Sequence, residues 1–151
     1  MKKGDEKTRS DVRKYGWQVL GVFEDETGPA FAYTIGLYQT FKHPEVLMIG
    51  LELEFMQGIL NNIGDDIKSG RRYEAGRAYP GIVENYDCSF QKIDEQFYGE
   101  YLGTAIRFYK RRDFPAFQCV FPDMKGCFPW DKGVNPELLE MQPVLTEHVK
   151  S

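Results

Sequence analysis

The stretch WQVLGVFEDETGPAFAYTIGLY, residues 17–38, decides the fold. It contains two apolar runs rich in strand-forming residues, at 17–23 and 30–38, which the polar segment EDETG separates. Two such runs joined by a short polar loop predict a β-hairpin. Gly36 interrupts the second run, and a glycine inside a strand pattern indicates a bulge or the close approach of another backbone segment.

The segments next to this hairpin predict a helix, a strand and a second helix. The charged segment 5–15 predicts a helix that Gly16 ends, and the apolar run VLMIGL at 46–51 predicts a buried strand. Apolar residues then recur at helical spacing over residues 53–70, with Phe55 at the start of the apolar face. This second helix has the clearest amphipathic pattern in the first half of the chain.

The second half repeats the same alternation of elements. Residues 79–93 predict one or two strands, residues 94–113 a helix, residues 116–121 a strand, and residues 136–141 a short helix. We therefore expect an α+β fold, with a mainly antiparallel sheet or a small split barrel against which two helices pack. We expect one domain over residues 1–151, in which the core spans 15–131 and the two ends are peripheral.

Composition narrows the classes of protein to consider. The 151 residues are 42% hydrophobic and carry a net charge of −4, which disfavours nucleic acid as a partner. No apolar run approaches the roughly 20 residues that span a bilayer, and no apolar segment of a secretory signal follows the first lysines. The three cysteines are an odd number, so we expect buried thiols and a cytoplasmic location.

The familiar catalytic and cofactor motifs are missing from the sequence, so the catalytic residues and the cofactor stay unassigned. The chain has only two histidines, His43 and His148. One hypothesis joins His43 with Glu45, Asp123 and Asp131 around a divalent metal. A second treats arginines 71, 72 and 77, beside two tyrosines, as a phosphate site.

The most specific signals are two motif-bearing regions. The first has YGW at 15–17, GPAFAYTIGL at 28–37, HPE at 43–45 and GL at 50–51, and the second is FQCVFPDMKGCFPWD at 117–131. Together they resemble a bacterial family known as domain of unknown function 4262. Phe121 stands where the family is expected to have tryptophan, so an indole donor is absent there. The resemblance implies no activity.

Seven polar or aromatic residues of these regions are the candidate ligand-binding residues: Tyr33, Thr34, His43, Glu45, Asp123, Trp130 and Asp131. They either line one ligand cleft or form a structural clasp in which the acids cap turns and tryptophans pack in the core, and the clasp is favoured. We accordingly expect a non-catalytic binding or protein-interaction module, with a protein partner or a small-molecule ligand. The alternative is a flavin- or small-molecule-binding split-barrel protein or enzyme, an analogy that rests on the order of elements alone.

Overall fold

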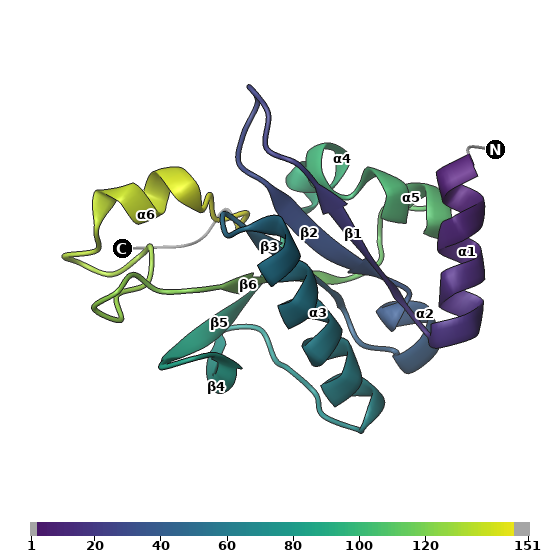
Figure 1. The fold of residues 1–151 in the computed structure, drawn as a ribbon, viewed down its shortest axis with the longest axis horizontal. Coiled ribbons are helices and arrows are strands. Elements are labelled where there is room, and N and C mark those ends of the chain that lie inside the picture. Colours follow the sequence, from purple (N-terminus) through teal and green to yellow (C-terminus); the bar gives the residue numbers. More distant parts are fainter. Residues whose placement is uncertain (1–2, 147–151) are drawn as a thin grey trace.

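A single six-stranded sheet organises the molecule, as a computed structural model that describes residues 3–146 shows (Figure 1). The strand order is β1-β2-β3-β6-β5-β4. The strands are β1 (Gln18–Val22), β2 (Phe31–Ile35), β3 (Glu45–Ile49), β4 (Arg77–Val83), β5 (Tyr86–Lys92) and β6 (Ala116–Val120). Neighbouring strands are antiparallel except for β3 and β6, which run parallel.

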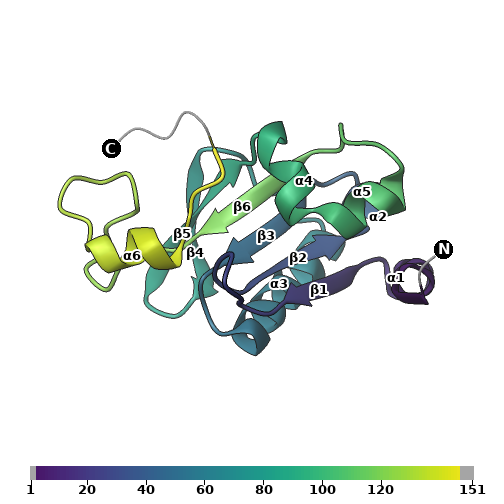
Figure 2. The same cartoon turned by 90° about the horizontal axis from the view of Figure 1, so that it is seen from above.

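Helices cover both faces of this sheet and lie at its two ends (Figures 1 and 2). The long helix α3 covers one face, α4 and α5 cover the other, and α1 and α6 lie at opposite ends. The helices are α1 (Lys3–Tyr15), α2 (Leu37–Phe41), α3 (Leu53–Lys68), α4 (Tyr98–Tyr101), α5 (Gly103–Tyr109) and α6 (Pro136–Met141), and the 3-10 helix η1 (Glu95–Phe97) precedes α4. Within residues 3–146, every helix is too short or too polar to cross a bilayer.

Two hydrophobic cores follow from this arrangement. Side chains alternate along a strand, so Val46 and Met48 of β3 join the core under α3, whereas Leu47 and Ile49 join the core under α4 and α5. All five residues of β3 are therefore buried, which explains the continuous apolar run in the sequence.

The mainly antiparallel α+β sheet is confirmed, and the sheet is open, so the small barrel is not observed. The expectation of two helices packed against the sheet is not confirmed, because six α-helices occur within residues 3–146. Residues 94–113 form η1, α4 and α5 instead of one helix, because Leu102, at φ −115° and ψ 33°, departs from helical geometry between two short turns. α3 agrees with its prediction, and α1 ends where Gly16 adopts a positive φ of 99°.

The hairpin is also confirmed, with Gln18 opposite Ile35 and Val22 opposite Phe31. Its second strand, however, ends at Ile35, and the chain turns into α2 at Leu37 instead of extending to residue 38. Gly36 makes this turn possible. Its φ is 110°, and a Cβ there would lie 2.9 Å from the carbonyl oxygen of Gly16, as expected for a close backbone approach.

Candidate functional site

Glu45 begins β3 and directs its carboxylate at the N-terminal end of α2. Its oxygens accept hydrogen bonds from the Thr34 hydroxyl at 2.8 Å, from the Tyr109 hydroxyl, and from the backbone N–H groups of residues 36, 37 and 38 at 2.9–3.3 Å. Burial raises the pKa of the Glu45 carboxyl, and the bonds from Tyr109 and Thr34 oppose that shift. Five donors leave this carboxylate little capacity for a ligand, so it acts as the cap of α2.

Both ring nitrogens of His43 are likewise engaged in hydrogen bonds within the chain. Its ring is buried, Nδ1 lies 2.8 Å from the carbonyl oxygen of Pro44, and Nε2 accepts the N–H of Tyr73 at 3.1 Å. These bonds assign the proton to Nδ1 and require a neutral ring. Burial accordingly lowers the pKa of His43. With both nitrogens bound to backbone groups, this histidine orders the segment before β3. The other histidine, His148, lies outside the described residues.

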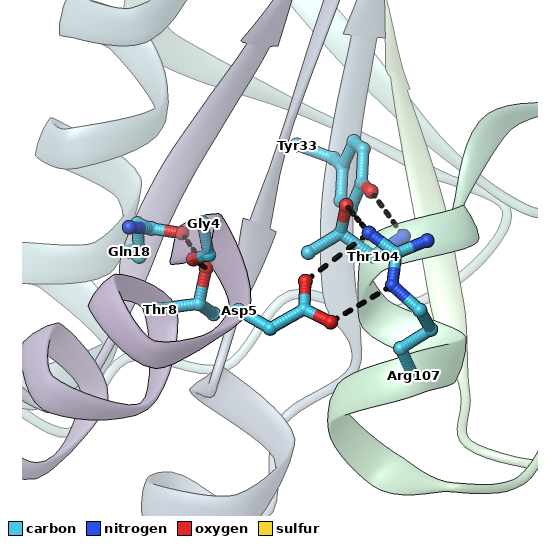
Figure 3. Close-up of polar contacts among 7 residues, drawn as sticks. All are labelled: Gly4, Asp5, Thr8, Gln18, Tyr33, Thr104 and Arg107. Atoms are coloured by element: carbon cyan, nitrogen blue, oxygen red, sulfur yellow. Dashed lines mark hydrogen bonds and ion pairs between the residues drawn. The ribbon is translucent and has the colours of Figure 1, made fainter. Parts of the chain in front are cut away.

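Tyr33 lies on the opposite face of β2 from Thr34, in the core under α4 and α5. Its hydroxyl oxygen accepts the N–H of Thr104, at the start of α5 (Figure 3). Burial raises the pKa of Tyr33. Arg107, one turn further along α5, donates to Asp5 of α1 at 3.0 and 3.2 Å and so ties α1 to the same helix.

Asp123 organises the loop that follows β6. Oδ1 accepts the N–H groups of Lys125 at 3.0 Å and Cys127 at 2.8 Å, and Oδ2 accepts that of Asn135 at 2.9 Å. The N–H groups of Asn135 and Cys127 lower the pKa of Asp123. One side chain thereby joins the two ends of the segment 123–135.

Asp131 and Trp130 continue this clasp. The Asp131 carboxylate accepts the N–H of Phe128 at 2.8 Å, and the Trp130 ring stacks on that of Phe128 with centroids 5.2 Å apart. The acids cap turns as the clasp interpretation requires. Trp130, however, is only half-buried, whereas Trp17 lies in the core and donates to Asn61 at 3.0 Å.

The structure therefore divides the seven residues among different parts of the fold. Thr34 and Glu45 are in direct contact, Tyr33 faces the other way, and the clasp belongs to the loop after β6. Over residues 3–146, no three His, Cys, Asp or Glu side chains are arranged to hold a metal ion, so the structure does not bring the four residues of the metal hypothesis together. Arg72, of the phosphate hypothesis, donates instead to the carbonyl oxygens of Phe41 and Lys42, at the C-terminal end of α2.

A groove that sequence reasoning missed lies beside the clasp. It is a hollow of about 430 Å³ between the start of α3, the β4–β5 hairpin, the end of β6 and α6. Its apolar lining consists of Leu51, Phe55, Val83, Tyr86, Phe121, Pro122, Met124, Leu138 and Met141. Leu51 and Pro122 belong to the two motif-bearing regions, and Asp123 fixes the loop that forms one wall.

Three large apolar side chains of this groove face solvent. Met124 is 89% exposed, Phe55 53% and Met141 43%. Phe55 was expected on the buried face of α3, but its neighbour Met56 is the residue that is buried at this point of the helix. The groove also has carboxylates, on Glu84, Glu137 and Asp123, and neither lysine nor arginine is among the residues that line it.

These observations define the class: an open-sheet α+β domain in which most of the polar motif residues bind the backbone and an apolar groove lies next to the clasp. The family model described as Domain of unknown function (DUF4262) matches residues 11–135, so the chain belongs to this family. No curated protein or solved structure matches the chain.

Proposed function

We propose that this protein is a non-catalytic binding module whose groove receives an apolar, positively charged segment of a partner protein. The observation that carries the proposal is the gathering of exposed Phe55, Met124 and Met141 around one hollow. Large apolar side chains that cluster on a surface mark interaction sites far more often than scattered ones do.

The polar residues of the motifs support binding over catalysis. Glu45, His43 and Asp123 are the natural candidates for acid–base chemistry, and each is bound to backbone or hydroxyl groups of the same chain. A general base needs a lone pair within reach of the substrate, and these groups have theirs engaged.

The chemistry of the groove specifies its occupant. Glu84 and Glu137 are exposed and lie at its margin, and a neighbouring hollow that shares Leu51 is bordered by Glu52 and Glu54. An amphipathic helix with leucines on one face and lysines at its borders would place apolar side chains against the flexible methionines and cations against the carboxylates. The free thiols of Cys88, Cys119 and Cys127 support action in a reducing compartment, which we propose is the cytoplasm.

A labelled model peptide of leucine and lysine at helical spacing tests this proposal. Met124→Asp should weaken its binding by about tenfold or more, because a carboxylate enters the apolar wall. Leu139→Asp is the matched control, since Leu139 is exposed on α6 but does not line the groove. Equal affinity of the two variants for the leucine–lysine peptide would overturn the proposal. So would a leucine–glutamate peptide that binds the wild type more tightly than the leucine–lysine peptide does.

Flavin is the alternative occupant, and it is tested in the same way. The residues lining the groove offer no cation to a flavin phosphate, which favours the peptide. Saturable binding of flavin mononucleotide that Met124→Asp abolishes, with no binding of the cationic peptide, would replace our proposal with the small-molecule alternative.

A further inference from the structure

The two edges of the sheet differ in how they are protected. Strand β4 forms one edge and carries Arg77, Pro80 and a register shift between Tyr79 and Val83. Charge, proline and irregular pairing are the features that keep an edge strand from pairing with another chain. The β4 edge is therefore blunted.

Strand β1, the other edge, has none of these protections. Its sequence QVLGV is uncharged and free of proline, and it pairs with β2 in regular register over all five residues. Figure 2 shows β1 along the border of the sheet, with α1 beyond its N-terminal end. Within residues 3–146, no strand pairs with its outer side.

The residues that flank β1 carry opposite charges at its two ends. Exposed Arg13 and Lys14 precede the strand, and exposed Glu24, Asp25 and Glu26 follow it. Large apolar groups accompany these charges, with Tyr15 57% exposed before the strand and Phe23 79% exposed after it. One end of the edge is thus basic and aromatic, and the other is acidic and aromatic.

We infer that β1 is a dimerisation edge that pairs antiparallel with β1 of a second copy of this chain. Antiparallel pairing about a twofold axis brings the basic end of each strand to the acidic end of its partner. The same axis places Tyr15 near Phe23 of the other copy, which buries both exposed rings. The uncharged strand lets the two backbones approach without like-charge repulsion, and parallel pairing would bring like charges together.

Charge exchange tests the inference. We expect light scattering to give the wild type twice the 17.5-kDa chain mass at high concentration. Arg13→Glu with Lys14→Glu, or Glu24→Lys with Glu26→Lys, should each weaken dimerisation by about tenfold or more, because both ends of the interface then repel. An equimolar mixture of the two variants should restore the dimer, since each heterodimer regains opposite charges at both ends.

The groove provides an independent control. Glu84→Lys with Glu137→Lys raises the net charge by as much as Glu24→Lys with Glu26→Lys, but it should leave the dimer intact. Failure of this inference and failure of the proposed function are therefore distinguishable. A monomeric wild type at every concentration would overturn the inference. A mixture that dimerises no better than its components would overturn it as well.

Discussion

Gly50 and Met141 are in contact through their backbones: a Cβ on Gly50 would lie 2.3 Å from the carbonyl oxygen of Met141. Gly50 follows β3 and adopts a φ of 101°, and Met141 ends α6. This contact holds α6 against the sheet, with Leu51 and Met141 both in the lining of the groove. The shape of the groove therefore depends on the absence of a side chain at position 50.

Gly50→Ala should destabilise the protein by roughly 2–4 kcal/mol, through a positive φ and a backbone clash together. Displacement of α6 should also weaken binding of the leucine–lysine peptide. Gly76→Ala is the control, because Gly76 has a φ of 81° but nothing within 4 Å of its added Cβ, so about 1–2 kcal/mol is expected. Urea unfolding measures both, and equal losses in stability would contradict the role of the contact.

Gly64 lets α3 pack directly on Trp17. A Cβ on Gly64 would lie 2.4 Å from the Trp17 ring, so Gly64→Ala should cost about 1–3 kcal/mol and change the tryptophan fluorescence. Gly58, on the same helix, has nothing within 4 Å, and Gly58→Ala should instead stabilise by about 0.5–1 kcal/mol. The two substitutions are chemically identical, so effects of the same sign would refute this account of the packing.

His43 should make the fold sensitive to acid. Burial lowers its pKa below the ordinary value of 6.5, so the unfolded chain takes up a proton first as the pH falls. The contribution of the neutral His43 ring to the stability of the fold is complete above pH 6.5. It is lost as the pH falls toward the pKa of His43 in the folded state.

His43→Gln retains an acceptor for the N–H of Tyr73 but cannot be protonated. Between about pH 7.5 and about pH 5.5, the urea midpoint of the wild type should therefore fall more than that of the variant. If the urea midpoints of the two proteins fell by the same amount, His43 would not be the titrating group.

Glu84 and Glu137 should set the charge preference of the groove. Glu84→Lys with Glu137→Lys should weaken the leucine–lysine peptide by about tenfold and flatten the salt dependence of its binding, because two attractive charges become repulsive. Fluorescence anisotropy at several salt concentrations measures both effects. If the peptide bound the double variant as tightly as the wild type, the groove would recognise it through apolar contacts alone.

Local pattern was enough to predict the hairpin, α1, α3 and β6, because each depends on the spacing of apolar residues or on a glycine stop. The break at Leu102 and the early end of β2 were not predictable in this way. At both places the structure has contacts that a local pattern does not contain: Thr104 donates to the Tyr33 hydroxyl, and the first N–H group of α2 donates to Glu45.

The candidate site was harder to predict than the fold. The sequence marks Asp123 clearly, but its role depends on Asn135, which lies 12 residues away. Phe55 and Met56 are neighbours of similar hydrophobicity, and only the placement of α3 relative to the sheet decides which one is buried. Met124 lies between Asp123 and Lys125 in a polar turn, so no periodic pattern indicated an apolar groove.

The most direct test of the account is to map the bound leucine–lysine peptide by NMR on the wild-type protein. We predict chemical-shift changes confined to the groove, largest for the methyl groups of Met124 and Met141 and for the ring of Phe55. Changes centred on Tyr33 or Glu45, with the groove resonances unmoved, would contradict the binding-module account.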